Sequence, residues 1–113
     1  MSTVKININY LVPPALDWAV CVCEKTQMGA YTRYSTDWAQ GGPIIERECI
    51  ELSFLGFDEI DEALPIWHAC KYLRGVLKEE QGPTALIAAM RCYVASKLGE
   101  IVEVPRELYK EDV

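Results

Sequence analysis

The segment Tyr34–Glu48 places a tryptophan among short hydrogen-bonding side chains and two glycines, in the order YSTDWAQGGPIIERE. Glycines let backbone N–H groups approach a ligand, an indole offers a flat face, and a helix that begins nearby favours an anion at its N-terminus. This composition is typical of a loop that contacts a ligand. The alternative is that Trp38 packs at the edge of the core, while Gly41 and Gly42 only supply a turn.

Arg91 is the only charged residue in the apolar segment from Ala85 to Ser96. A guanidinium on an apolar helix must find a carboxylate, backbone carbonyls or a ligand anion, because leaving it dry and unpaired costs several kcal/mol. Three interpretations stay open for Arg91: an ion pair with Asp37, Glu46 or Glu48, a contact with a ligand anion, and a contact with a second copy of the chain.

Catalytic and metal-binding motifs are absent from the sequence. It has one histidine, His68, and five cysteines, with no C-x-x-C pair, H-E-x-x-H, Walker loop, G-x-G-x-x-G or G-x-S-x-G. Cys21 and Cys23 would point to different sides of a helix and cannot chelate one ion from one face. We therefore expect no metal, no cofactor and no enzymatic activity, with reduced thiols that pack as small apolar side chains. An enzyme acting through His68 and a cysteine is the catalytic alternative.

Length and charge exclude several classes of protein. The 113 residues are half hydrophobic and a quarter charged, which predicts a single globular domain over residues 1–113. Seventeen acids against eleven bases give a net charge of −6, which opposes binding to duplex nucleic acid. No apolar run is long enough for a membrane span and the first residues do not form a secretory signal, so we expect a cytoplasmic protein without membrane contact.

Two helices are predicted. The longer covers Thr84–Leu98, with Thr84 as N-cap and Gly99 as its stop, and its nearly continuous apolar surface places it across the middle of the fold. The shorter covers about Pro14–Lys25 after the proline pair at its start.

Alternating apolar residues predict strands. The first is Val4–Tyr10, with Val4, Ile6, Ile8 and Tyr10 inward. Loop residues are predicted at Gln40–Pro43, and a solvated connection at Asp58–Glu62. The other predicted strands are Ala30–Tyr34, Cys49–Leu55, Pro65–Leu73 and Ile101–Val104. The order of these elements predicts an α+β fold, in which a small, mostly antiparallel sheet packs against the long helix of the C-terminal half, with a shorter N-terminal helix.

Four blocks of the sequence resemble a known family. They are ALDWAV at 15–20, STDWAQGGPIIERE at 35–48, GPTALIAAMRCYVASKLG at 82–99 and VEVP at 102–105. In this order they are similar to the NinX-like family of small proteins from tailed phages and prophages, over roughly residues 14–108, with a loose match across Leu55–Gln81. The resemblance implies a phage-encoded protein that acts in the bacterial cytoplasm during infection. It implies no reaction.

The leading hypothesis is a non-enzymatic protein that binds a small molecule. Its ligand would be anionic and nucleotide-like, a signal of the host's defences that the phage protein sequesters. Tryptophans would stack on a base, arginines would bind phosphate, and glycine backbone and polar side chains would complete the site. The candidate residues are Arg33, Asp37, Trp38, Gln40, Gly41, Gly42, Arg47, Trp67 and Arg91.

The alternative function is a protein-binding module that inhibits or redirects a host bacterial protein. This hypothesis predicts a flat apolar patch around Trp18 and Val22 and no deep pocket. A homodimer is the default expectation for assembly, because two-fold pairs are the commonest oligomers.

Overall fold

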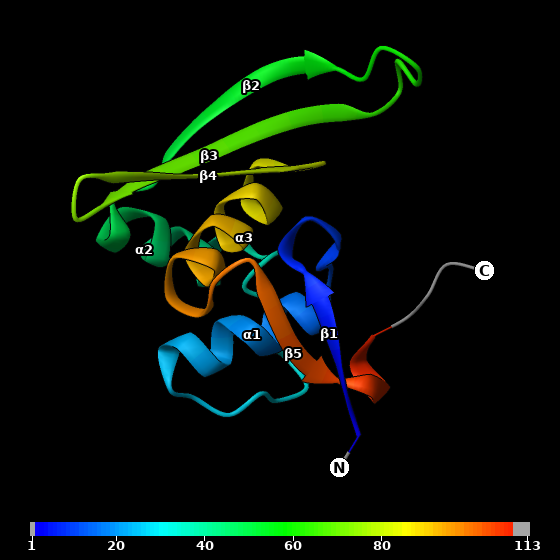
Figure 1. Ribbon diagram of the computed structural model, residues 1–113, viewed down its shortest axis with the longest axis vertical. Coiled ribbons are helices and arrows are strands. Elements are labelled where there is room, and N and C mark those ends of the chain that lie inside the picture. The colour runs from blue at the N-terminus through cyan, green and yellow to red at the C-terminus, as the bar shows by residue number, and fades with distance from the viewer. Residues whose placement is uncertain (1, 110–113) are drawn as a thin grey trace.

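The computed structural model describes residues 2–109, and over that range the chain forms two antiparallel sheets and three α-helices (Figure 1). In the two-stranded sheet, β1 (Thr3–Asn7) pairs with β5 (Ile101–Pro105). In the three-stranded sheet, the order is β2 (Glu51–Phe57), β3 (Pro65–Leu73) and β4 (Val76–Gly82). The predicted α+β class is therefore confirmed, with its strands divided between two sheets.

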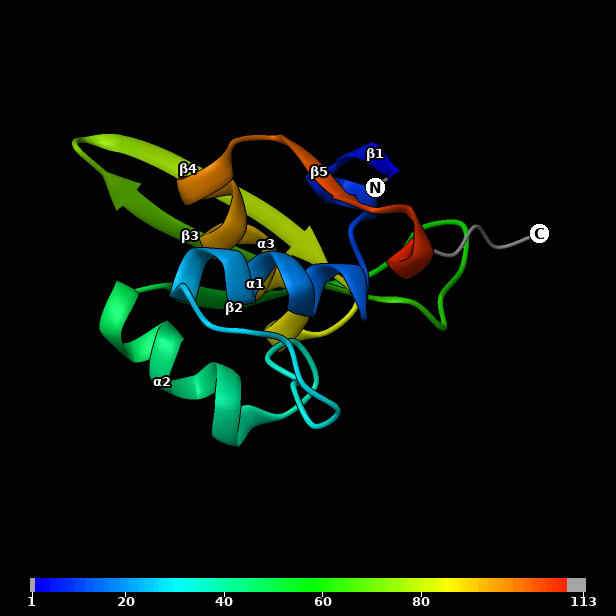
Figure 2. The same cartoon turned by 90° about the horizontal axis from the view of Figure 1, so that it is seen from below.

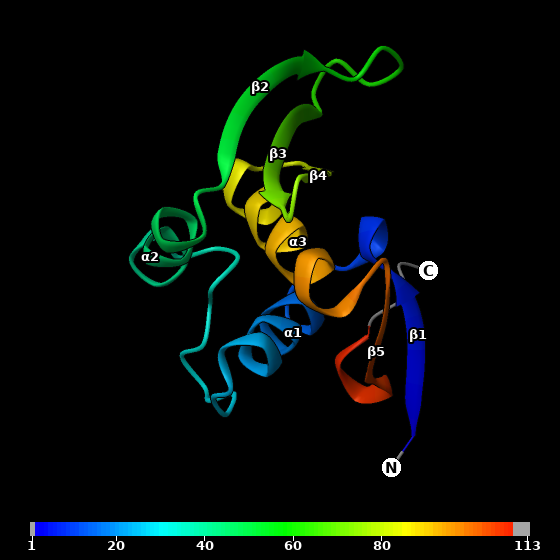
Figure 3. The ribbon, with the colours of Figure 1, turned by 60° about the vertical axis from the view of Figure 1, so that its left-hand side comes forward.

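The three helices are α1 (Ala15–Glu24), α2 (Trp38–Glu48) and α3 (Ala85–Leu98), and two short 3-10 turns, η1 (Ile8–Tyr10) and η2 (Arg106–Leu108), follow β1 and β5. The longest helix, α3, lies between the three-stranded sheet on one side and α1 on the other (Figures 1 and 3). Seen from below, α1 runs across α3 on the side away from that sheet (Figure 2). None of the helices in residues 2–109 is long and apolar enough to cross a membrane.

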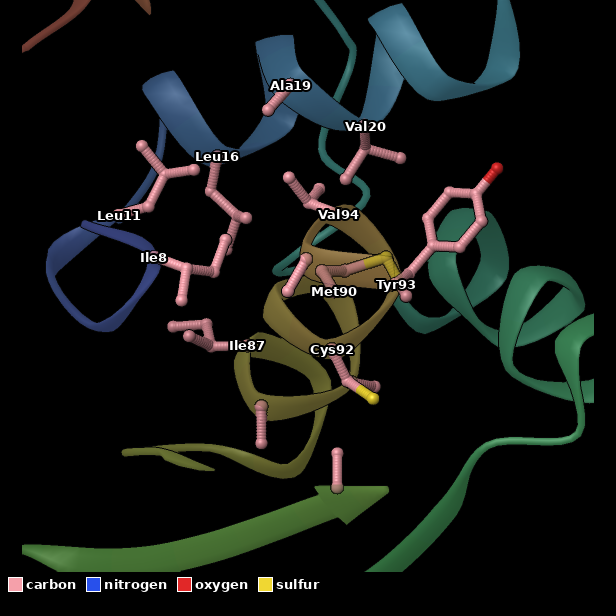
Figure 4. Close-up of a cluster of buried hydrophobic side chains, with 14 of the residues drawn as sticks. Ile8, Leu11, Leu16, Ala19, Val20, Ile87, Met90, Cys92, Tyr93 and Val94 are labelled. Atoms are coloured by element: carbon pink, nitrogen blue, oxygen red, sulfur yellow. The ribbon is translucent and has the colours of Figure 1, made fainter. Parts of the chain in front are cut away.

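The core forms around α3, as its apolar sequence predicts. The Thr84 hydroxyl caps the helix by accepting a hydrogen bond from the Ile87 N–H at 3.0 Å, and every residue from Leu86 to Ala95 is buried. Side chains of α1 and η1 close on this helix (Figure 4), where Leu16 and Val20 face Met90 and Val94. Burial on both sides explains why α3 has no polar face.

Helix α2 corrects the prediction of a loop at Gln40–Pro43. Asp37 begins the helix by accepting a hydrogen bond from the Ala39 N–H at 2.9 Å, and the helix then continues through both glycines and Pro43. Helix propensity argues against this path. Packing outweighs propensity because Gly41 is buried where α2 meets the start of α3, a contact too close for a side chain.

The two glycines of α2 give a matched pair of variants. A Cβ at position 41 would overlap the Tyr34 carbonyl oxygen and lie 2.6 Å from Leu86 Cδ1, so we expect Gly41→Ala to lower the free energy of unfolding by about 2–3 kcal/mol. At position 42 the nearest atom would be 4.0 Å away, so Gly42→Ala should raise stability by about 0.5–1 kcal/mol through helix propensity. Urea unfolding of the two variants measures both, and equal effects would contradict this packing.

Three further predictions need correction. The chain at Ala30–Tyr34 forms turns instead of a strand, because the Gln40 side chain accepts from the Arg33 N–H and donates to the Tyr31 carbonyl oxygen. Strand β1 ends at Asn7, whose side chain accepts from the Asn9 N–H at 2.9 Å and starts η1. Tyr10, predicted to face inward, is therefore 72% exposed.

Strand β4 had no counterpart among the predicted strands. Its sequence VLKEEQG alternates weakly because the edge of the sheet carries charged side chains. The helix at the N-terminus, the strands near Cys49–Leu55, Pro65–Leu73 and Ile101–Val104, and the exposed connection at Asp58–Glu62 all occur as predicted. The charges of the sequence also predict a tail over Arg106–Val113, of which residues 110–113 lie outside the described residues.

Candidate functional site

A groove of about 870 Å³ opens at one corner of the three-stranded sheet. Strand β4 ends with Gly82 opposite Trp67, whereas β3 begins earlier, at Pro65. In the described part of the chain, the first residues of β3 therefore have no strand partner on that side. The 3-10 turn η1, the loop between β2 and β3, the segment just before α3, and Arg91 within α3 surround the open space. Its lining comprises Asn9, Tyr10, Asp58, Leu64, Pro65, Ile66, His68, Glu79, Glu80, Gln81, Gly82, Pro83 and Arg91.

Arg91 supplies the positive charge of the groove. Its residue is 7% exposed, with Nε donating to the Leu11 carbonyl oxygen at 3.0 Å and Nη1 donating to the Gln81 carbonyl oxygen at 2.8 Å. Nη2 has no hydrogen-bond partner within residues 2–109. Burial lowers the pKa of Arg91 and the nearby Glu80 carboxylate opposes this shift, yet a guanidinium stays charged at neutral pH. The groove therefore contains a fixed cation with unused donors.

The contacts of Arg91 contradict the ion pair that was one of its three interpretations. Neither Asp37, Glu46 nor Glu48 forms a salt bridge with it in the described part of the chain. Two carbonyl oxygens orient the guanidinium without neutralising it. A ligand anion would meet a preoriented charge in a partly desolvated place, where a charge-assisted hydrogen bond is strongest.

Carboxylates occupy other parts of the groove wall. Asp58 Oδ1 accepts the backbone N–H groups of Ile60 and Asp61 at 2.8 and 3.0 Å, and these bonds lower the pKa of Asp58. Burial and repulsion from Glu100 raise the pKa of Glu80, while Arg91 acts in the opposite direction. The groove is thus mixed in charge, with one strong cation set against several acids.

His68 lies where the groove meets the outer face of the sheet. Its Nε2 is 3.0 Å from Glu79 Oε1, and its Nδ1 is 3.4 Å from Ser53 Oγ, across three neighbouring strands. The thiols of Cys70 and Cys92 form hydrogen bonds with other groups: Cys70 donates to Glu51, and Cys92 donates to the Lys78 carbonyl oxygen.

The thiol environments favour protonated cysteines. Burial raises the pKa of Cys23 to about 11 and that of Cys92 to about 12. Because the thiolate is the nucleophilic form, these two side chains act as small apolar groups in the fold at neutral pH.

Arg47 is held by a network that joins four elements. Its Nη2 lies 2.6 Å from Glu24 of α1, its Nε lies 2.9 Å from Glu48, and its guanidinium stands 5.7 Å from the centroid of the Tyr93 ring. Lys71 of β3 binds the other side of Glu48 at 2.8 Å. The donors of Arg47 point to this network, so it contributes to the packing of α2.

The hydrogen bonds of this network lower the pKa values of the Glu24 and Glu48 carboxyl groups. Hydrogen bonding to Arg47 lowers the pKa of Glu24 despite burial, and the Tyr93 hydroxyl adds a further hydrogen bond to the same carboxylate. For Glu48, burial acts to raise the pKa, but hydrogen bonds from Lys71 and Arg47 outweigh it and the pKa falls.

The polar residues that precede and begin α2 bind one another. Gln40 bonds to the Arg33 backbone N–H, and its Nε2 lies 3.3 Å from Asp37 Oδ2. Trp38, beside them, is 54% exposed. A smaller cavity of about 370 Å³ lies near this loop and includes Arg33 in its lining.

The nine candidate residues therefore fall in four places. Arg33, Asp37, Trp38, Gln40, Gly41 and Gly42 gather at the start of α2, and Arg47 stands at the far end of that helix. Trp67 lies on β3 with its ring centroid 5.1 Å from that of Phe54. Arg91 alone of the nine lines the larger groove.

Sequence reasoning missed most of the groove. Besides Arg91, the sequence signals in the groove are the lone histidine and the Gly82-Pro83 pair before α3. Tyr10, Glu79 and Glu80 belong to segments whose structure was predicted incorrectly or not at all. Gly82 is buried there, and a Cβ on it would lie 2.7 Å from the Ala88 backbone nitrogen. This close packing brings the end of β4 against α3, beside Arg91.

Comparison with known proteins adds the family. Among curated proteins, no sequence matches this chain. The model of the family described as "Bacteriophage P22, NinX" matches residues 7–97. This range includes η1, the three-stranded sheet, helices α1 and α2, and all of α3 except its last residue, Leu98. The chain therefore belongs to the bacteriophage P22 NinX family.

Proposed function

We propose that this phage-family protein binds an anionic, nucleotide-like small molecule in the groove beside Arg91, without transforming it. In this proposal it acts in the cytoplasm of the infected cell, where it sequesters a signal of the host's defences. Membership in a phage family supports a role during infection.

The observation that carries the proposal is the state of Arg91. Buried charged side chains in proteins are typically paired with an opposite charge. Arg91 is instead held by two carbonyl oxygens, and its Nη2 has no hydrogen-bond partner within residues 2–109, at the wall of an open groove. A phosphate or carboxylate group of a ligand would complete its hydrogen bonding.

The groove has further properties that suit a small molecule. Its volume of about 870 Å³ lies in the range of ligand pockets. Tyr10 is well exposed on its wall, so its ring can stack on a heterocycle. Leu64, Pro65 and Ile66 add apolar surface to the lining.

Adenosine 5′-monophosphate is a suitable probe. We expect saturable one-site binding by isothermal titration calorimetry. Ile66→Trp, which fills the groove from β3, should weaken this binding at least about tenfold. Leu77→Trp adds the same side chain at an exposed position of β4 outside the groove lining and should leave binding unchanged. The absence of binding, or equal binding by both variants, would contradict the proposal.

A second candidate function rests on an adjacent surface, which shares Leu64 with the groove. The β2–β3 hairpin curves away from the body beyond the start of α3 (Figure 3). It carries well-exposed apolar side chains, which we call the hairpin patch: Phe54, Leu55, Phe57, Ile60 and Leu64. Exposed apolar patches favour protein contacts, so this is the surface on which the protein would bind a host protein or a second copy of itself.

The patch differs from the one expected around Trp18 and Val22. Trp18 is partly buried against the core, and only Val22 is exposed. For the protein-binding hypothesis, a partner should be retained by Ile101→Asp, which changes an exposed isoleucine of β5, and lost with Ile60→Asp. Self-association would appear as a mass that rises with concentration and is reduced by Ile60→Asp.

A further inference from the structure

We infer that the groove accepts a ligand with a single anionic group and several hydrogen-bond donors, as in a nucleoside monophosphate, and discriminates against polyphosphates. This inference rests on the proposed function, because it concerns the same groove. It follows from the arrangement of charge around Arg91.

The groove lining contains one permanent cation and three carboxylates. Arg91 is the cation, and the acids are Asp58, Glu79 and Glu80. The first anionic group of a ligand would accept a hydrogen bond from the unused Nη2 of Arg91. Among residues 2–109, the lining offers a second or third phosphate no further arginine or lysine, and that phosphate would lie near carboxylates, which repel it.

The acids also present free acceptor atoms. Glu79 uses Oε1 for His68, and Asp58 uses Oδ1 for backbone N–H groups of its own loop. Within residues 2–109, Glu79 Oε2, Asp58 Oδ2 and both carboxylate oxygens of Glu80 have no protein donor. Ligand hydroxyl or amino groups are the complementary chemistry.

The acids alone would not define a site, because exposed carboxylates are satisfied by water. The buried guanidinium sets the orientation of the ligand, since Arg91 lines the groove and its Nη2 has no hydrogen-bond partner within residues 2–109. With the anionic group at Arg91, the rest of the ligand must extend along the walls that carry the carboxylates. Attraction at one end and acceptors along the remainder together select a ligand with one anionic group attached to a donor-rich body.

The test compares adenosine, AMP, ADP and ATP by calorimetry without divalent cations. The wild-type protein should bind AMP at least about tenfold more tightly than ATP. In the double variant Glu79→Gln/Glu80→Gln the groove keeps its size but loses two negative charges, so ATP binding should strengthen and the ratio should fall to about threefold or less. Higher ionic strength should narrow the same ratio for the wild-type protein, because salt screens the repulsion.

Glu103→Gln/Glu107→Gln is the matched control. It changes the net charge by the same amount at two exposed acids of β5 and η2, outside the groove lining, and should keep the wild-type ratio. ATP binding as tight as AMP binding would overturn the inference, as would an equal change of the ratio in both double variants or a ratio that does not respond to salt. In those cases nucleotide binding itself would still stand, whereas failure of every nucleotide to bind would refute the proposed function.

Discussion

Replacing Lys71 with methionine is expected to lower the free energy of unfolding by about 3 kcal/mol, because it leaves a buried carboxylate without one of its two cations. The Lys71 ammonium lies 2.8 Å from Glu48 Oε1, and the two side chains are only 7% and 15% exposed. Methionine retains the apolar stem of lysine, so the change isolates the charge. Urea unfolding at neutral pH measures the loss.

Lys5→Met is the matched control for this variant. Lys5 pairs with Glu103 at 4.0 Å, but their side chains are 74% and 58% exposed, and such pairs contribute about 0–1 kcal/mol. A double variant, Lys71→Met with Glu48→Gln, should recover part of the loss because the uncompensated charge is gone. Equal effects of Lys71→Met and Lys5→Met would show that the network around Glu48 does not stabilise the fold.

Replacing Arg91 with methionine is expected to abolish AMP binding and also to destabilise the protein. The buried carbonyl oxygen of Leu11 and the partly buried carbonyl oxygen of Gln81 lose their donors, and an unsatisfied buried acceptor costs about 1–3 kcal/mol. We therefore expect a loss of about 2–4 kcal/mol for the two acceptors together. Calorimetry with AMP and urea unfolding measure the two effects separately.

Arg91→Lys separates the charge from the hydrogen-bond geometry. An ammonium keeps the positive charge but cannot reach both carbonyl oxygens and a ligand with the planar fork of a guanidinium. AMP binding should fall about tenfold to a hundredfold, which corresponds to about 1.4–2.8 kcal/mol, and the loss of stability should be smaller than for methionine. Wild-type affinity in a folded Arg91→Met or Arg91→Lys protein would contradict the role of Arg91.

The elements that could be predicted from the sequence are those whose local signals agree with their tertiary environment. Helix α3 combines a capping threonine, a continuous apolar run and a terminal glycine, so propensity, periodicity and burial lead to the same assignment. Helix α2 shows the opposite case. Its glycines and Pro43 disfavour a helix, and the buried contact of Gly41 with Leu86 that stabilises it is between residues far apart in the chain.

The groove could not be predicted for a related reason. Arg91 was recognised because a charge on an apolar helix needs a partner, but its partners are backbone oxygens eighty and ten residues away, which no side-chain pattern reveals. The walls of the groove are formed by η1, by the first residues of β3 and by the last residues of β4. Their proximity depends on where β4 stops relative to β3, and β4 was not predicted because its charged residues hide its alternation.

The most direct test of the account is a nuclear magnetic resonance titration of ¹⁵N-labelled protein with AMP and, separately, with adenosine. We predict that AMP shifts the guanidinium resonances of Arg91 and the backbone amides around Gln81 and Gly82, and that adenosine, which has no phosphate, leaves the Arg91 signals in place. Shifts confined to the start of α2 around Trp38, or Arg91 signals that do not respond to AMP at saturation, would contradict the assignment of the groove as the ligand site.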